Sequence, residues 1–333
     1  MEGAVRAQAG KLAFTLLLAL AAGAAEAASL SLELLGNGPV PVPGIGNAEL
    51  SGVTWLGDGR FLAVDDGRSR VIPLEITLDD ATGAIQKVEA GAYVSLAGAH
   101  DPEGIARRPN HDSVLVVDEG TRDVREYDSA SGELLRVIAP PARYEGRVKK
   151  NNGFEGIAAA ADGKSTWIAT EGPLRQDGRG PNATSGGWIR LQRLDASLAP
   201  AGQYAYRTEA GLGFVGVVDL STTPEGELLV LERALTGGGF SARIFQVDLS
   251  QATDVTSFEK LRNRDDFRAV TKQKLWERAG GFQNFEGMAL GPALAIGGRL
   301  VLLVSDGGNQ RPPSVLALRL TRREAEAPES GTR

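Results

Sequence analysis

The feature of this sequence that most constrains its fold is a short phrase that occurs five times, each time before a hydrophobic run and an acid. The phrases occupy residues 50–54, 102–106, 154–158, 218–222 and 285–289. The acids at the ends of the runs are Asp66, Glu119, Glu171, Glu232 and Asp306. Because the runs are rich in leucine and β-branched residues and lie between glycine turns, each copy predicts antiparallel strands.

The spacing of the copies indicates how many strands each one contains. Positions 51, 103, 155, 219 and 286 are separated by 52, 52, 64 and 67 residues. A period of about 40–70 residues with several strands in it is typical of a β-propeller, whose blades cannot bury their faces alone. In the second copy, four strands are expected near residues 103–107, 113–118, 122–128 and 133–139.

We therefore predict an all-β fold, a single β-propeller of four-stranded antiparallel blades. The last copy has room for three strands, and an unassigned strand at residues 29–35 is expected to complete it and close the ring. Five repeats are counted, and a sixth, degenerate blade within the longer third and fourth copies stays an alternative. Of the insertions in these copies, residues 175–187 predict a surface loop and residues 258–270 predict a short helix.

The composition is that of a globular chain rich in turns. The 43 glycines among 333 residues are nearly twice the average share of roughly 7%. A formal net charge of −6 excludes an electrostatic nucleic-acid binder, because phosphate contacts need a basic face. With no cysteine and two histidines, the sequence also excludes thiol catalysis, disulfides and Cys/His zinc sites.

The N-terminal segment predicts export. Arg6 and Lys11 precede an apolar run at residues 12–22, and residues 25–27 have the A-x-A form that a signal peptidase cuts. The run is too short to span a bilayer, which needs about 20 apolar residues. We expect a signal peptide at 1–27 cleaved after Ala27, a propeller domain at 28–322 and a disordered tail at 323–333. The mature protein is expected to be a secreted or periplasmic monomer without a membrane span.

The hairpin in each copy brings two acids to the same end of the blade. The first acid opens a strand and the second ends the antiparallel strand that follows, so both return to one side. If the phrase forms the innermost strand, the first acids surround one mouth of the axial channel; they are Glu103, Glu155, Asp219 and Glu286. The acids that end the hydrophobic runs form a second, slightly outer ring. Up to nine carboxylates then raise each other's pKa and need cations nearby.

Two kinds of cation are candidates for this mouth. Several arginines lie close to ring acids in the sequence, namely Arg68, Arg107, Arg122, Arg175 and Arg233. Carboxylate ligands with scarce imidazole also favour a hard divalent cation, Ca²⁺ first and Mg²⁺ or Mn²⁺ after it. The candidate metal ligands are Glu103, Glu155, Glu171, Glu286 and Asp306, with Asp66, Asp219 and Glu232 as further ligands. The alternative is that individual acids only accept hydrogen bonds from neighbouring backbone N–H groups.

The chemistry expected of such a site is hydrolysis by a metal-activated water. No Gly-x-Ser-x-Gly nucleophile motif is present, so a bound water is the more economical nucleophile. The candidate catalytic residues are Glu155, Glu171 and Glu119, together with Arg233, because an arginine side chain can bind a phosphoryl group through two N–H groups.

This pattern resembles the phytase-like family, also called the esterase-like activity of phytase family, whose members repeat an N/D-x-E-G phrase before an acid that ends a hydrophobic strand. The resemblance covers about residues 51–320, and its most specific parts are residues 284–287 with 305–307, 218–220 with 229–233, and 154–156 with 170–172. Two copies depart from the pattern, because Ser51 stands in place of an acid and Asp219 lies slightly out of register.

The resemblance implies phosphate-ester hydrolysis by a calcium-dependent propeller. We therefore expect a secreted, metal-dependent hydrolase with a small anionic or ester substrate. Two alternatives stay open. One is a calcium propeller that cleaves lactones or carboxylic esters, and the other is a non-catalytic periplasmic propeller that binds a partner.

Overall fold

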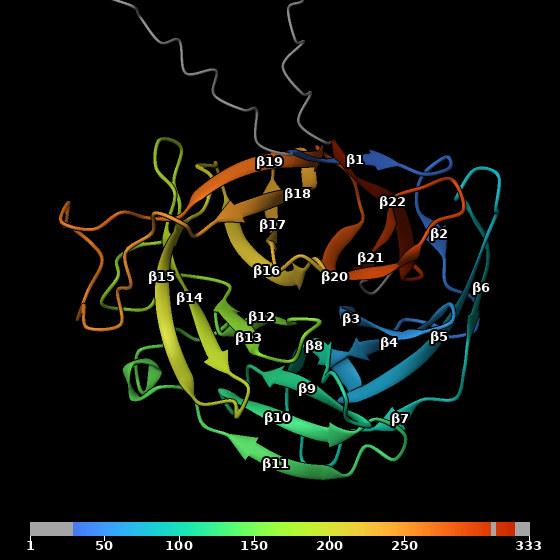
Figure 1. Ribbon diagram of the computed structural model, residues 1–333, viewed down its shortest axis with the longest axis horizontal. Coiled ribbons are helices and arrows are strands. Elements are labelled where there is room, and N and C mark those ends of the chain that lie inside the picture. The colour runs from blue at the N-terminus through green and yellow to red at the C-terminus, as the bar shows by residue number, and fades with distance from the viewer. Residues whose placement is uncertain (1–28, 308–310, 324–333) are drawn as a thin grey trace, which may run out of the picture. The chain divides into compact units, whose positions relative to one another are not determined.

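Five antiparallel sheets follow one another along the chain, and each forms one blade of a ring (Figure 1). The computed structural model describes residues 29–307 and 311–323, of which residues 30–322 belong to one compact unit. The predicted all-β propeller is confirmed, with five blades and no sixth in these described residues. The predicted signal peptide at 1–27 lies outside them, as do residues 324–333 of the predicted tail.

The blades follow chain order, and the first strands of neighbouring blades contact one another around the centre. The first blade contains β3 (Leu50–Gly57), β4 (Arg60–Asp65), β5 (Arg70–Leu78) and β6 (Ile85–Ala90), with β7 (Val94–Ser95) beside β5. The second blade contains β8 (Pro102–Arg107), β9 (Ser113–Asp118), β10 (Asp123–Asp128) and β11 (Leu134–Ile138). The third and fourth contain β12 (Phe154–Ala159), β13 (Ser165–Thr170), β14 (Trp188–Asp195) and β15 (Pro200–Arg207), and then β16 (Phe214–Thr222), β17 (Leu228–Thr236), β18 (Gly239–Asp248) and β19 (Thr271–Arg278). The fifth contains β20 (Asn284–Ala293), β21 (Arg299–Asp306) and β22 (Ser314–Arg323).

Helical structure is confined to two single turns in the described residues, Asp66–Arg68 and Ala142–Tyr144. No helix in the described residues is long and apolar enough to cross a membrane.

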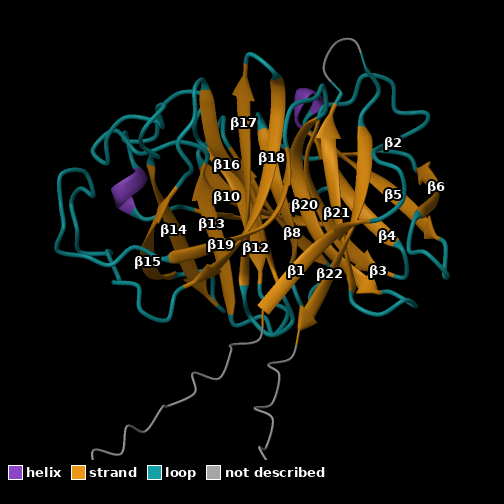
Figure 2. Cartoon of the chain, turned by 90° about the horizontal axis from the view of Figure 1, so that it is seen from above, coloured by secondary structure: helices purple, strands orange, loops and turns teal. Residues whose placement is uncertain are grey.

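The ring closes by pairing the two ends of the described chain. The strand β1 (Ser29–Leu34) lies beside β22 and supplies the outermost strand of the fifth blade, as expected (Figure 2). The hydroxyl oxygens of Ser31 and Thr321 are 2.7 Å apart across this pair. The short strand β2 (Val40–Pro41) also pairs with β22. This arrangement covers an edge of β22 that would otherwise present unpaired N–H and C=O groups.

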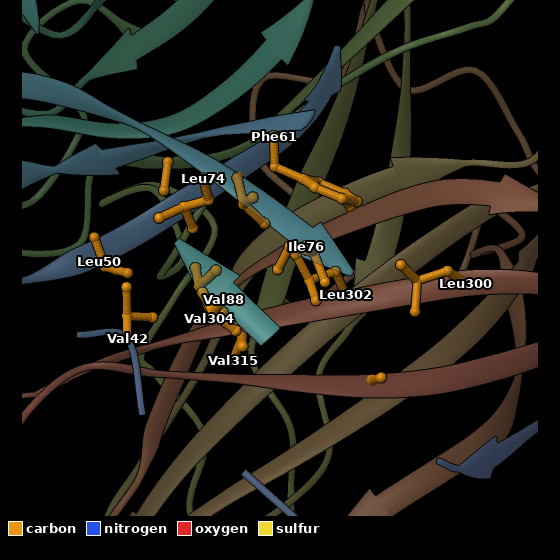
Figure 3. Packing of buried hydrophobic residues seen from close by; sticks show 14 of the residues in the cluster. Val42, Leu50, Phe61, Leu74, Ile76, Val88, Leu300, Leu302, Val304 and Val315 are labelled. Carbon is orange, nitrogen blue, oxygen red and sulfur yellow. The ribbon is translucent and has the colours of Figure 1, made fainter. Parts of the chain in front are cut away.

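The hydrophobic core is divided among the seams between blades, and each of the five seams has its own cluster of buried residues. Figure 3 shows the seam between the first and the last blade, where Phe61, Leu74 and Ile76 face Leu300 and Leu302. Valine, leucine and isoleucine fill most of these seams, because alternate residues of each strand point towards the neighbouring blade.

The helix predicted at residues 258–270 is wrong, because the segment forms turns without a helix. Its backbone is bonded to distant parts of the chain: the N–H of Val270 donates to the carbonyl of Ala205 on β15 (3.0 Å), and the N–H of Leu261 donates to the carboxylate of Asp177 (2.8 Å). Leu261 and Phe267 pack with Ala205 in a small separate cluster. Tertiary partners therefore satisfy the polar backbone groups that a helix would have paired internally.

Candidate functional site

A β-bulge near the start of the inner strands sets the position of their acids. In blade three, the pairing of β12 with β13 skips Glu155. In blade five, the pairing of β20 with β21 skips Glu286 in the same way, and in blade two the skipped residues are Glu103 and Gly104. A bulge re-aims the side chain of the extra residue away from the regular ladder. The recurrent Glu-Gly phrase thus corresponds to one bulge in each of these three blades.

The glycine of each phrase permits neighbouring inner strands to touch. A Cβ atom on Gly104 would lie 2.1 Å from the backbone oxygen of Glu155, and one on Gly52 would lie 2.4 Å from the backbone oxygen of Glu103. These distances are shorter than any contact a side chain tolerates, so only glycine fits. We call this constriction the glycine level, and it comprises Gly52, Gly104, Gly156, Asp219 and Gly287.

Four blades carry an acid at the same position, at the end of the second strand, and the fourth blade carries a different residue there. Asp66, Glu119, Glu171 and Asp306 each follow the residue that pairs with the inner-strand residue directly before the bulge. In blade four, Val217 pairs with Glu232, so the residue in this register is Arg233. The fourth blade therefore contributes a cation where the other four contribute an acid.

Electrostatic interactions connect seven carboxylates in a group that we call the acid ring: Asp66, Glu103, Glu119, Glu155, Glu171, Glu286 and Asp306. Burial, followed by the charge of Glu286, raises the pKa of Asp66 to about 8. Burial also raises the pKa of Glu286 to about 7, although Arg233 acts in the opposite direction. The ring thus holds carboxyl groups that ionise reluctantly, although most of these residues are only half-buried.

Two members of the acid ring have no direct bonding partner in the described residues. Burial and then the charge of Asp66 raise the pKa of Glu103 well above its usual range, and burial and then the charge of Glu103 do the same to Glu155. Within the described residues, neither carboxylate accepts a hydrogen bond or forms an ion pair. Glu119 differs from them, because it accepts a hydrogen bond from the backbone N–H of Gly153.

Arg233 bridges two acids of the ring. Its guanidinium donates to the carboxylates of Glu171 and Glu286, and it also donates to the side-chain oxygen of Asn284 (3.2 Å). Arg233 therefore forms an ion pair with one acid of the third blade and one acid of the fifth. One guanidinium therefore offsets part of the charge of seven carboxylates.

Two predicted site residues, Asp219 and Glu232, take other positions. Asp219 lies at the glycine level, where its carboxylate accepts hydrogen bonds from the N–H groups of Met288 (2.7 Å) and Leu220 (2.8 Å). Glu232 is buried and accepts hydrogen bonds from the hydroxyl of Tyr206 (2.6 Å) and from Lys272 (2.8 Å). Both acids are thus satisfied by structural partners away from the acid ring, as the backbone-bonding alternative expects for Asp219.

The register of Glu232 explains its structural role. The equivalent residues of blades one and two are Asp65 and Asp118. Each of the three acids accepts a hydrogen bond from a backbone N–H in the segment that precedes the inner strand of its own blade; the donors are Glu49, His100 and Glu209. In blades one, two and four, the sequence has an acid directly before the ring position: Asp65, Asp118 and Glu232. Treating this acid as a position of its own, distinct from the ring acid that follows it, would have assigned Arg233 and not Glu232 to the acid ring.

The sequence assigned no separate role to two asparagines that support the acids. The side-chain amide of Asn284 donates to Glu286 (2.9 Å) and to Asp306 (3.5 Å), and that of Asn152 donates to Glu171 (3.4 Å). Asn284 opens the Asn-Phe-Glu-Gly phrase, so its position two residues before the acid was a usable signal.

The donor set of the ring consists of carboxylate oxygens, which suit Ca²⁺ and other hard cations. As the side chains lie, no group of three or more histidines, aspartates and glutamates in the described part of the chain is arranged to hold a metal ion. The unpaired carboxylates of Glu103 and Glu155 fit a cation chemically, and a metal would require these side chains to adopt other rotamers.

Comparisons with solved structures find other proteins of similar fold. They include hydrazine synthase of Kuenenia stuttgartiensis (12% identity, TM-score 0.39, 86% of this chain and 65% of that one). They also include the PQQ-bound aldose sugar dehydrogenase of Streptomyces coelicolor (15% identity, TM-score 0.42, 88% and 99%) and glutaminyl cyclase of Myxococcus xanthus (10% identity, TM-score 0.43, 88% and 98%). This chain spans less than two thirds of the hydrazine synthase chain. None of these likenesses carries an argument about chemistry.

A search of curated proteins returned no match. A family profile does match, over residues 45–307, and its description is "Phytase-like: Esterase-like activity of phytase". The matched region includes the inner strands of all five blades and every residue of the acid ring. The chain therefore belongs to the phytase-like family.

Proposed function

We propose that this protein is a hydrolase that binds a divalent cation, Ca²⁺ first, in the acid ring and cleaves phosphate esters there. The observation that carries the proposal is the pair of carboxylates on Glu103 and Glu155, which have neither hydrogen-bond donors nor ion-pair partners within the described residues. Such groups either keep their protons or bind a cation, since like charges close to one another oppose ionisation.

The balance of charge supports a cation more strongly than protonation alone. Arg233 pairs with Glu171 and Glu286, whereas Asp66, Glu103, Glu119 and Glu155 form no ion pair with an arginine or lysine in the described residues. Calcium takes six to eight oxygen ligands in flexible geometry, so a set of glutamates with adjustable side chains suits it. The residues that would hold the ion are Glu103, Glu155, Glu171, Glu286, Asp306 and Asp66.

A cation bound there would polarise the ester and lower the pKa of a water molecule. The chain's own residues supply the remaining functions. Glu155 accepts a proton from the water as the water oxygen bonds to phosphorus and the bond from phosphorus to the ester oxygen breaks. The leaving alkoxide takes up a proton from the solvent as it departs, and Glu155 then releases its proton to the solvent. Arg233, when Glu171 and Glu286 turn to the ion, binds a phosphoryl oxygen through its N–H groups.

Export belongs to the same proposal. Residues 1–27 have the pattern of a signal peptide, and calcium is abundant outside the cytoplasm. We infer a secreted or periplasmic protein cleaved after Ala27. Mass spectrometry of protein recovered from the medium or the periplasm should find an N-terminus at Ala28, and an intact Met1 would contradict this.

The enzymatic test compares phosphate esters with carboxylic esters and lactones. We expect calcium-dependent release of p-nitrophenol from p-nitrophenyl phosphate, at least 100-fold slower in Glu155→Gln. The matched control is Glu145→Gln, because Glu145 is exposed and lies outside the ring. Turnover of p-nitrophenyl acetate or a lactone instead would replace the substrate class with that of the esterase alternative. Calcium binding without turnover of any of these would favour the non-catalytic binding protein.

A further inference from the structure

A cavity lies on the other side of the glycine level from the acid ring. Its volume is about 240 Å³, and all five inner strands line it. The lining residues Val53, Ile105, Ile157, Leu220 and Met288 each follow directly after the residue at the glycine level, whereas Glu103, Glu155 and Glu286 directly precede it. We call this space the axial cavity. Its walls are therefore contributed by strand positions different from those of the acid ring.

The charge of the axial cavity is opposite to that of the acid ring. Among the described residues, no aspartate, glutamate or histidine lines it, while two arginines do, Arg107 and Arg299. Each guanidinium donates to a backbone carbonyl, Arg107 to Leu56 (3.3 Å) and Arg299 to Gly291 (3.0 Å). Neither forms an ion pair within the described residues. In a chain of net charge −6, this concentration of unpaired positive charge indicates an anionic ligand.

Two residues that line the cavity each carry a buried donor that has no acceptor in the described residues. The indole Nε1 of Trp55 and the Nε of Arg299 are both buried without a hydrogen-bond partner in the described residues. The guanidinium carbon of Arg299 lies 6.0 Å from the centre of the Trp55 ring. A buried donor that lacks an acceptor costs about 1–3 kcal/mol, so both groups favour a ligand that offers oxygen atoms.

The donors occupy one sector of the cavity. Trp55 lies on β3, and Arg107 on β8 is tied to that strand, because its backbone N–H donates to the hydroxyl of Thr54 (2.9 Å). Arg299 begins β21 in the blade on the other side of β3. The hydroxyl of Thr222, in contrast, already donates a hydrogen bond to the carbonyl of Ala159 (2.9 Å). The cavity thus has a cationic side, and mainly aliphatic residues together with Ser221 and Thr222 line the rest.

We propose that the axial cavity binds a small organic anion with an apolar body, a monocarboxylate in the first instance. The carboxylate lies against Arg299, Arg107 and Trp55, because a guanidinium and an indole N–H donate to its oxygens. The apolar body lies against the valine, isoleucine, leucine and methionine side chains of the inner strands. Binding sites for small molecules commonly combine an apolar lining with a few convergent polar groups, and the volume here suits a ligand below drug size.

The test uses octanoate as the probe and calorimetric titration of the full mature chain. Octanoate should bind with one site per chain, and at least tenfold more tightly than octanol, which lacks the charge, or acetate, which lacks the apolar body. Binding should also change the fluorescence of Trp55, and this change should be lost in Trp55→Phe. Octanoate affinity should be the same with calcium and with chelator, which separates this site from the acid ring.

Two variants decide the role of the arginines. Arg299→Gln should weaken octanoate binding at least tenfold, and Arg107→Gln should weaken it at least threefold. Arg107 is exposed, so its replacement tests the proposal even if Arg299→Gln does not fold. The matched control is Arg60→Gln on the surface of the first blade, which should bind octanoate normally. Absence of octanoate binding, equal binding of octanol, or unchanged affinity in both arginine variants would overturn the proposal.

Discussion

Arg233 donates a hydrogen bond to Glu286 from the strand register at which the other four blades carry an acid. Arg233 is thereby placed among the carboxylates of the acid ring, and it reaches Glu171 as well. The arrangement leaves more negative charge than positive at one mouth of the propeller. From this imbalance follow the expected responses of the protein to substitution, pH and calcium.

Replacing Arg233 should destabilise the metal-free protein. Arg233→Gln leaves Glu171 and Glu286 without their ion-pair partner, and breaking such a buried pair costs about 3–5 kcal/mol. The control is Arg243→Gln, whose partner Glu277 is more exposed and whose loss should cost about 1 kcal/mol or less. Urea denaturation in the presence of chelator measures both. Equal stability of the two variants would contradict the role assigned to Arg233.

The stability of the metal-free protein should fall as the pH rises. Burial raises the pKa of Asp66 from 3.8 to about 8 and that of Glu286 from 4.5 to about 7. Both groups bind protons more tightly in the folded state, so their contribution is complete below the unfolded pKa values and is lost as the pH rises through the folded ones.

Calorimetry in chelator should therefore show a Tm that decreases between about pH 5 and pH 8. Asp66→Asn should reduce this decrease, whereas Asp58→Asn, at an exposed surface carboxylate, should leave it unchanged. A Tm that is constant or rises over this range, in the parent protein and in Asp66→Asn alike, would show that these carboxyl groups are not shifted as described.

The glycine level should tolerate no side chain. In Gly104→Ala, the added methyl group meets the backbone oxygen of Glu155, and the strain should cost about 3 kcal/mol. Gly180→Ala is the control, because no atom lies within 4 Å of its added carbon. Thermal unfolding of both variants provides the comparison. A Gly104→Ala protein as stable as the parent would mean that the inner strands are not in contact there.

Closure of the ring by β1 should be visible in a single side chain. Leu30 is buried in the seam between the fourth and fifth blades, and Leu30→Ala should cost about 2–5 kcal/mol. Leu34 on the same strand is 41% exposed, and Leu34→Ala should change stability by about 0.5 kcal/mol or less. If the two substitutions had equal effects on the free energy of unfolding, β1 would not be packed as described.

Much of the architecture was predictable because the repeat and the strand pattern agree. The four strands expected in the second copy match β8 to β11 to within one or two residues, since hydrophobic runs between turns mark strand ends. The equivalence of Asp66, Glu119, Glu171 and Asp306 was also predictable, because each ends the same strand of its blade.

The fourth blade was less predictable, because its pairing depends on a bulge. The pairing of β16 with β17 skips Val218, so Asp219 falls at the glycine level and Arg233 takes the ring position. Shifting a strand by one residue moves each side chain to the other face, which is why Glu232 points to Tyr206. The turns at residues 258–270 were unpredictable for another reason, since their partners, such as Ala205, are distant in sequence.

Titration of calcium into the chelated protein by calorimetry tests the central claim most directly. We expect calcium binding in the parent and in Glu145→Gln, and at least tenfold weaker binding in Glu103→Gln and Glu155→Gln. Calcium at 100–1,000 times its dissociation constant should also raise stability by about 3–4 kcal/mol. Absence of binding, or the same affinity in all four proteins, would contradict the account and leave the acid ring as a structural feature of the blades.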